Sequence, residues 1–180
     1  MSAQSSTQWS IRILTSADAA AFRALRLRAL KEHPDAFTSS YEEDVAKPLS
    51  ATEQRIAGEP DNVFWGAFVD GAIRGMVGLT REARAKNRHK GDVVAMYVAP
   101  EFGRRGLARA LLQAVIDHAR DGAGLEQLVL TVTRGNTAAR DLYDASGFTT
   151  FGLEPRALKV GGDYFDKEHM ILFLREPHEH

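Results

Sequence analysis

The chain has 180 residues, 44% of them hydrophobic and 26% charged, and its formal net charge is −1. These values fit one globular domain, and they provide no overall basic field that would attract nucleic acid or an anionic membrane. The sequence contains no cysteine, which excludes disulfides, thiolate metal sites and a covalent intermediate on cysteine.

Both ends of the chain are polar. Residues 1–8 are expected to be a disordered N-terminus, residues 9–175 a single domain, and residues 176–180 a frayed tail whose PHEH sequence is not expected to bind a metal. The sequence has no apolar stretch of 18 residues and no signal-peptide pattern near Met1. A cytoplasmic protein without membrane attachment is therefore expected.

The N-terminal third predicts one strand and two helices. Trp9–Leu14 alternates in hydrophobicity as a strand does, and Ser16 is expected to cap a helix that directs Phe22 and Leu25 inward. Leu49–Ala57 predicts a second, short helix. The segment between the two helices is expected to be irregular.

The middle of the chain predicts a hairpin and a central strand. Asn62–Val69 and Ala72–Arg81 flank Asp70-Gly71, which is a strong two-residue turn signal. After a polar stretch, the apolar run Val93–Val98 predicts a strand that Pro100 ends, because proline lacks the N–H group that a ladder requires.

A basic, glycine-containing turn precedes the next helix. Polar residues recur from Leu107 at helical spacing, so a helix is expected to begin near Gly106. The turn Gly103–Gly106 then supplies unpaired first-turn N–H groups and two arginines, which together favour phosphate binding. An ordinary turn with solvated arginines explains this local pattern about equally well.

A second motif follows the strand predicted for Leu128–Val132. Asn136 is expected to cap a short helix that Gly147 ends. Asn136, Ala139 and Tyr143 share one face of this helix because they are about one and two turns apart. Core packing alone would also explain such a face.

The last part of the chain predicts a second hairpin-like pair. Its strands are Phe148–Leu153 and Tyr164–Leu174, bridged through Gly161-Gly162. The full order is then β, α, α, β, β, β, α, β, α, β, β. Such a mix of hairpins and strand–helix–strand crossovers implies a mixed sheet with helices on both faces.

The two motifs together resemble those of the GNAT family of acyl-CoA-dependent N-acyltransferases, and the resemblance extends over roughly Ile11–Leu174. The family's first block reads V-x-P and then [RQ]-x-x-G-x-[GA], and its second reads N-x-x-A-x-x-x-Y-x-x-x-G-F. The chain departs from the first block at Gly103, where the family usually carries arginine or glutamine, and Arg104 is the candidate substitute. The resemblance implies an α/β fold of mixed α+β type, with a mostly antiparallel central sheet of about six or seven strands and about four helices.

The resemblance also implies acetyl-CoA as the acyl donor and no metal. Backbone N–H groups of the glycine-rich loop would bind the pyrophosphate of the coenzyme. Main-chain groups of the central strand would pair with the pantetheine arm and the acyl carbonyl. The cofactor-binding residues implied in this way are Met96, Tyr97, Val98, Arg104, Arg105, Gly106, Leu107, Ala108, Arg109, Asn136, Ala139 and Tyr143.

The resemblance makes Tyr143 the candidate general acid. A phenol has a pKa near 10 and a thiol one near 8.5, so the tyrosine can protonate the departing thiolate. The general base is less defined. Asp92, at the start of the central strand, is the first candidate, although a solvated charge at a strand end explains it equally well, and the alternatives are His89, Glu42, Glu43 and Asp166.

Glu42 and Glu43 belong to the segment SSYEED, in a region that shapes the acceptor site in this family. An acidic acceptor pocket would favour cationic amines, and an exposed polar turn is the alternative interpretation. The expected partners are acetyl-CoA and an amine acceptor, either a small molecule or a protein amino group, with no nucleic acid and no membrane. A homodimer through the C-terminal strands is a family-level expectation.

The sequence bears on three possible functions. The first is an N-acyltransferase that moves an acetyl group directly from acetyl-CoA to an amine within a ternary complex. The second is a catalytically silent acyl-CoA-binding sensor or scaffold, which would have no need of an acid such as Tyr143 near the sulfur. Other nucleotide enzymes have little support, because the Walker pattern is absent and no G-x-G-x-x-G follows a strand.

Overall fold

The computed structural model describes residues 8–175, so the expectations for residues 1–7 and for the tail 176–180 fall outside the described residues. The described chain forms a seven-stranded sheet and five α-helices. The strands are β1 (Trp9–Ile13), β2 (Asn62–Val69), β3 (Ala72–Arg81), β4 (Lys90–Val98), β5 (Gln127–Thr133), β6 (Thr149–Val160) and β7 (Asp163–Phe173). The helices are α1 (Ala19–Glu32), α2 (Tyr41–Ala46), α3 (Leu49–Arg55), α4 (Leu107–Asp117) and α5 (Thr137–Ala145).

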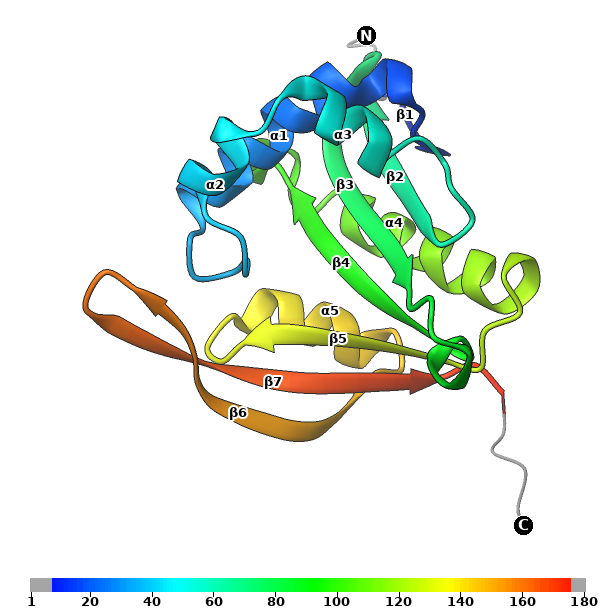
Figure 1. Ribbon diagram of the computed structural model, residues 1–180, viewed down its shortest axis with the longest axis vertical. Coiled ribbons are helices and arrows are strands. Elements are labelled where there is room, and N and C mark those ends of the chain that lie inside the picture. Colours follow the sequence, from blue (N-terminus) through cyan, green and yellow to red (C-terminus); the bar gives the residue numbers. More distant parts are fainter. Residues whose placement is uncertain (1–7, 176–180) are drawn as a thin grey trace, which may run out of the picture.

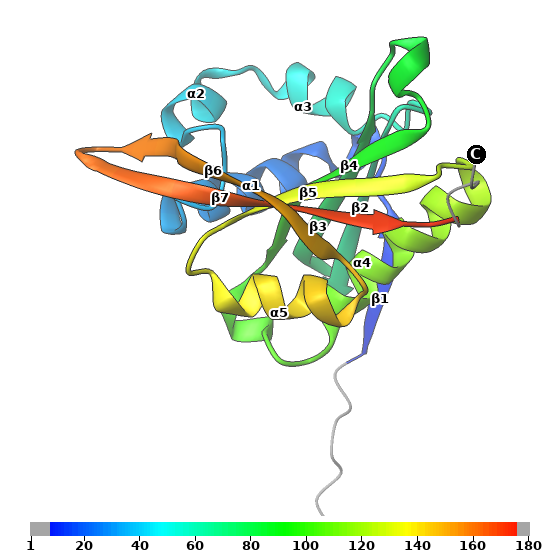
Figure 2. The ribbon, with the colours of Figure 1, turned by 90° about the horizontal axis from the view of Figure 1, so that it is seen from below.

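The sheet has the strand order β1-β2-β3-β4-β5-β7-β6, and its only parallel pair among the described strands is β4–β5 (Figure 1). Helices α2 and α3 lie on one side of the sheet and α4 and α5 on the other (Figure 2). The mixed, mostly antiparallel sheet with helices on both faces confirms the predicted fold class. None of the helices in the described part is long and apolar enough to cross a membrane.

Two apolar cores hold the helices to the sheet. One packs the inward side chains of α4 and α5 against the sheet, and its fully buried members include Leu111 and Val115. The other packs α1 through Phe22 against the opposite face, where its ring meets Phe64 of β2 edge to face at 5.5 Å between centroids. The second core also takes Ile56, the residue after α3.

The first predicted hairpin is confirmed with the same bounds for both strands. Asp70 and Gly71 have φ of 50° and 79°, which is the left-handed geometry that a tight hairpin turn of this kind requires. The second hairpin is also present, but β6 is longer than predicted. A register shift between Glu154 and Leu158 absorbs Pro155, and β6 is an edge strand, where proline is tolerated.

The N-terminal helices differ from the prediction at two places. Ser16 is not the cap of α1, because Thr15 and Asp18 close a short 3-10 turn and α1 begins at Ala19. The segment predicted to be irregular contains α2, whose N-terminus is fixed by Ser40 and Glu43: each side chain bonds the backbone N–H of the other. A helix of six residues is too short to show an apolar periodicity. The capping box is the sequence signal that could have indicated it.

Strand β4 changes its pairing in the middle. It pairs with β3 from Gly91 to Val94, and the register then shifts before Tyr97 and Val98 pair again. Ala95 takes a φ of 57° within this bulge. On its other side β4 pairs with β5 only through residues 90–92, so the two strands diverge from Val93 onward (Figure 1).

Candidate functional site

The divergence of β4 and β5 leaves a cavity of about 740 Å³ bounded by β4, α4, α5 and the segment after α1. It brings together residues from both sequence motifs, which are far apart in the chain. The predicted cofactor residues that line it are Met96, Tyr97, Val98, Arg104, Ala108, Asn136 and Ala139. The other residues that contribute to this wall include Leu142, Arg134 and Phe165.

The glycine-rich loop forms one end of this cavity. Arg104 and Gly106 have φ of 57° and 82°, and Gly106 stands as the N-cap of α4. The first-turn N–H groups of α4 have no intrahelical acceptor, and such a turn followed by a helix N-terminus is suited to an anion. Before the loop, the turn Pro100–Phe102 is fixed by Glu101, whose two carboxylate oxygens accept hydrogen bonds of 2.6 and 2.8 Å from Arg28 of α1.

Five predicted cofactor residues do not line the cavity: Arg105, Gly106, Leu107, Arg109 and Tyr143. Leu107 is buried in the apolar core, and Arg109 is exposed on α4. The guanidinium of Arg105 lies 5.1 Å from the centre of the Phe102 ring. Leu107 could therefore contact a cofactor only through its backbone N–H.

Replacing Gly106 with valine should raise the Kd for acetyl-CoA about tenfold, or about 1.4 kcal/mol, with little change in kcat at saturation. A branched residue is strained at a φ of 82°, and its side chain would enter the open space at the N-terminus of α4. Titration of acetyl-CoA by calorimetry measures the effect. The matched control is Gly58→Val, which carries the same strain at a φ of 85° in a distant loop and should leave the Kd unchanged.

A second cavity of about 220 Å³ adjoins the first and lies at the point where β4 leaves β5. The two cavities share Ala36, Phe37 and Met96 in their walls. The second is lined by residues 93–96 of β4, by Thr131 of β5 and by Tyr143 of α5. A cofactor arm that runs along β4 in the first cavity would therefore end in the second.

Tyr143 is 6% exposed and contacts the Phe148 ring edge to face, with 5.9 Å between the centroids. Burial raises the pKa of Tyr143 to about 12, so the phenol keeps its proton at any physiological pH. Asn136 begins α5 as predicted: its side-chain oxygen accepts a hydrogen bond of 3.2 Å from the N–H of Ala139.

Asp92 lies on β4 between Thr80 of β3 and Val129 of β5, one residue before the strands diverge. It is half-buried, and this burial raises the pKa of its carboxyl group. Asp92 lines neither cavity, but Val93 next to it lines the second.

None of the other candidate bases lines either cavity. Asp166 accepts a hydrogen bond of 2.9 Å from the N–H of Arg156 within the second hairpin. The carboxylate of Glu43 accepts the bond from the Ser40 N–H that caps α2. Glu42 lines a third cavity of about 610 Å³ between the α2 region and residues 158–161 of β6 and its turn, and this cavity shares Phe37, Thr38 and Ser39 with the cavity that Tyr143 lines. His89, just before β4, accepts a bond at its carbonyl from the N–H of Glu126.

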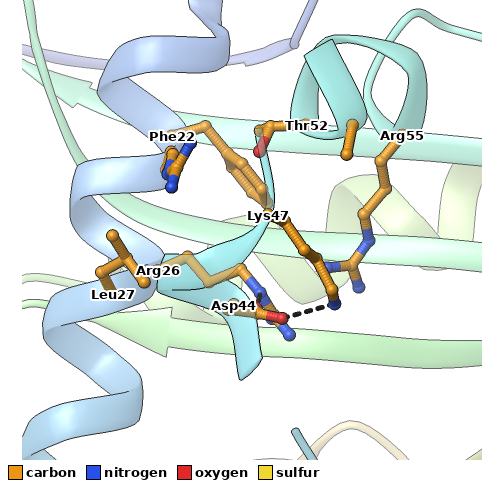
Figure 3. Close-up of a pocket in the computed structure, with 9 residues that line it drawn as sticks. Phe22, Arg26, Leu27, Asp44, Lys47, Thr52 and Arg55 are labelled. Carbon is orange, nitrogen blue, oxygen red and sulfur yellow. Dashed lines mark hydrogen bonds and ion pairs between the residues drawn. The ribbon is translucent and has the colours of Figure 1, made fainter. Parts of the chain in front are cut away.

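Charged side chains near the second cavity were not singled out by the sequence. Figure 3 shows them converging between α1 and the segment of α2 and α3, around a cavity of about 280 Å³. Arg26 of α1 and Asp44 of α2 form a buried ion pair, and Lys47 reaches the same carboxylate at 2.7 Å. Burial opposes ionisation of Asp44, but the bonds from Lys47 and Arg26 outweigh it and lower the pKa of this carboxyl group. Arg55 of α3 points into the same space.

The chain was compared with known proteins. A model of the acetyltransferase (GNAT) family matches residues 27–148. N-alpha-acetyltransferase RimI of Mycobacterium tuberculosis is 33% identical over 115 residues, which are 64% of this chain and 69% of RimI. A mycothiol acetyltransferase of Thermobispora bispora is 32% identical over 139 residues, or 76% of this chain, and the match spans 45% of that protein.

Solved structures agree with these matches. A GNAT-family acetyltransferase from Streptococcus pneumoniae superposes with a TM-score of 0.84 at 27% identity, covering 92% of this chain and 99% of the other. The yncA protein of Salmonella typhimurium, solved with its cofactor acetyl-CoA, has the same fold, with a TM-score of 0.79 at 24% identity over 96% of this chain and 98% of its own. The chain therefore belongs to the GNAT family and is an acetyl-CoA-dependent N-acetyltransferase.

Proposed function

We propose that the protein transfers the acetyl group of acetyl-CoA directly to an amine that occupies the second cavity, within a ternary complex. The observation that carries this proposal is the pair of adjoining cavities, one able to take the coenzyme arm beside β4 and the other lined by Tyr143. The names of the relatives give acceptors as different as an α-amino group for RimI and spermidine for a Vibrio cholerae enzyme. They do not select one acceptor for this chain.

The reaction can be written with the residues at hand. The neutral amine nitrogen attacks the acetyl carbonyl carbon and an N–C bond forms; the nitrogen then loses one proton to water, and the C–S bond breaks as the coenzyme A thiolate leaves. Tyr143 gives its proton to that sulfur and is reprotonated from solvent. The β4 main chain at the bulge, near Ala95 and Met96, supplies the N–H groups for the carbonyl oxygen. The net products are the amide, free coenzyme A thiol and one proton from the acceptor ammonium.

Asp92 is proposed to accept the proton of the acceptor ammonium through water. The pKa of its carboxyl group is raised toward neutral pH, which suits a general base. Asp92→Asn should lower kcat/KM about a hundredfold and remove the acidic limb of its pH profile, because activity is lost as the pH falls through the pKa of this base. Asp121→Asn, an exposed carboxylate after α4, is the control. An acidic limb that survives in Asp92→Asn would exclude this role.

The transferase itself is tested by release of free coenzyme A thiol from acetyl-CoA against amino acids, polyamines, aminoglycosides and peptides. The protein has no cysteine and so contributes no thiol background. Release that depends on the acceptor is the expected result. Tight binding of acetyl-CoA without release for any amine would instead favour the silent binding module.

A homodimer through the last two strands is part of the proposal. Apolar side chains that are 48 to 61% exposed lie on this hairpin: Phe151, Leu153, Tyr164 and Phe173. Sedimentation that shows only monomer at working concentration would contradict the dimer.

A further inference from the structure

The second cavity is positively charged. Its wall contains Arg26 of α1, Arg55 of α3 and Lys167 of β7, and none of the described residues that line it is acidic. These three cations come from elements far apart in the sequence, and they surround the place where an acceptor would meet the thioester. The charge balance around them decides what the cavity can hold.

Only Arg26 has a carboxylate of its own. Its guanidinium is paired with Asp44, and Asp44 also forms an ion pair with Lys47. One carboxylate is therefore already shared by two cations. Within residues 8–175, Arg55 has no ion pair and no hydrogen bond, and its contact is the face of the Phe64 ring at 5.0 Å. Burial and the nearby charge of Arg26 lower the pKa of Arg55 to about 10, which still leaves it charged at neutral pH.

Lys167 also lacks a carboxylate partner in the described chain. Its side chain is 6% exposed, and its ammonium donates one long hydrogen bond of 3.4 Å, to the hydroxyl of Thr38. Burial lowers the pKa of Lys167, and Glu154 acts on it only through space. No carboxylate lies within ion-pair distance of this ammonium in the described chain. The cavity thus holds a half-buried guanidinium and a buried ammonium with no carboxylate at ion-pair distance among the described residues, and Asp44, whose charge acts on Arg55 through space, is already paired with Arg26 and Lys47. A ligand that brings a negative charge would lower the cost of this arrangement.

We propose that the acceptor is a small amine that also carries a carboxylate or a similar oxyanion, and that Arg55 and Lys167 hold this anion while the amine faces Met96 and Tyr143. This inference rests on the proposed acetyl transfer and specifies its substrate class. Guanidinium and ammonium groups are the usual protein partners of carboxylates. A cationic amine without an anion would meet three positive charges on the way to the thioester.

The geometry favours a free amino acid over a peptide. The amine and the anion must share one cavity of about 220 Å³, so they must be a few bonds apart. In an α-amino acid the carboxylate is next to the amine, whereas a peptide N-terminus has a neutral amide at that place. The sequence-based prediction of an acidic pocket at Glu42 and Glu43 gives the opposite preference, and the experiment separates the two.

The test is acetyl-CoA-dependent thiol release with matched acceptors. Each L-amino acid is compared with its amide, its decarboxylated amine and its 1-aminoalkylphosphonate, for example leucine, leucinamide, 3-methylbutylamine and the leucine phosphonate analogue. We expect acetylation of at least one free amino acid, with kcat/KM at least 30-fold lower for the matched amide and amine. The phosphonate shows whether the site requires a carboxylate or accepts another oxyanion. Amides, decarboxylated amines or polyamines that react as well as the acids would overturn the inference.

Arg55→Gln tests the anchor itself. It should raise KM for the amino acid tenfold or more, raise kcat/KM for the decarboxylated amine because one repelling charge is gone, and leave the Kd for acetyl-CoA unchanged. Arg120→Gln removes one exposed positive charge after α4 and is the control for net charge. If Arg55 serves only to pack on Phe64, its replacement lowers the Tm and affects all acceptors equally, and that result contradicts the proposal. Lys167→Met should show the same selective loss.

The failure of this inference is distinguishable from failure of the transferase proposal. If none of the amines is acetylated, the transferase proposal fails, and the acceptor class is then decided by binding to the coenzyme A-saturated protein. Amino acids that raise its Tm where their decarboxylated amines do not would still support the anion site. Equal shifts, or none, would reject it.

Discussion

Tyr143→Phe is expected to lower kcat by about 10² to 10⁴, the range typical of a lost general acid, while the Kd for acetyl-CoA stays the same. The phenol is buried at the wall of the second cavity, and phenylalanine fills the same space without a proton to give. The packing against Phe148 is retained, so the Tm should change little. Steady-state kinetics at saturating acetyl-CoA, together with calorimetric titration of the cofactor, measure both quantities.

The matched control is Tyr164→Phe, a tyrosine 51% exposed on β7. The pH profile adds a second criterion. The pKa of Tyr143 is raised to about 12, so the acid form persists as pH rises, and ionisation of this group should produce no alkaline decline of kcat below about pH 10. A kcat of the Tyr143→Phe enzyme equal to that of the original protein would remove the tyrosine from the chemistry.

Asp44→Ala is expected to lower the free energy of unfolding by about 3–5 kcal/mol. The substitution leaves the buried guanidinium of Arg26 without its counter-ion, and it leaves Lys47 and Arg55 near an uncompensated positive charge. For a chain of this length the loss corresponds to a fall in Tm of roughly 6–20 °C. Urea unfolding followed by circular dichroism measures it.

Glu53→Gln, an exposed carboxylate on α3, controls for the loss of one negative charge and should change stability by less than about 0.5 kcal/mol. The pKa of Asp44 is lowered in the folded state, so its contribution is present above the ordinary aspartate pKa and is lost as pH falls through the lowered value. The difference between Asp44→Ala and the original protein should therefore shrink in acid. Asp44→Ala with Arg26→Met should recover part of the loss, and equal stability of the single and double variants would contradict the buried-pair argument.

The sequence predicted those parts of the molecule that local patterns specify. The first hairpin was predictable because Asp70 and Gly71 favour left-handed geometry. The start of α5 was predictable because asparagine is a good N-cap, and Asn136 accepts the hydrogen bond from the N–H of Ala139. The two motifs and the residues next to them contain most of the residues that line the first cavity. Ser16 was misassigned because a 3-10 turn precedes α1, and no pattern separates that turn from a first helical turn.

The cationic cavity was not predictable in the same way. Arg26, Arg55 and Lys167 lie on three elements and share no motif, spacing or periodicity. Their juxtaposition depends on the packing of α1 with α3 and on the position of β7 beside β5, which are tertiary facts. The same reason explains why the sequence left the base open: the burial of Asp92 at the point of divergence, which supports it as the proposed base, is a property of the folded chain.

Strands β4 and β5 pair only through residues 90–92 and 127–129. Beyond these residues the facing edges of the two strands do not pair with each other, although both strands lie inside the sheet. Exposed edges of this kind invite pairing with a strand of another molecule and so promote aggregation. Here a bulge with Ala95 at a φ of 57° interrupts the edge of β4, and the pairing of residues 90–92 with β5 closes one end of the opening. If the coenzyme arm lies in this opening as proposed, its amide groups pair with these edges, and the occupied edges are then closed to a strand of another molecule.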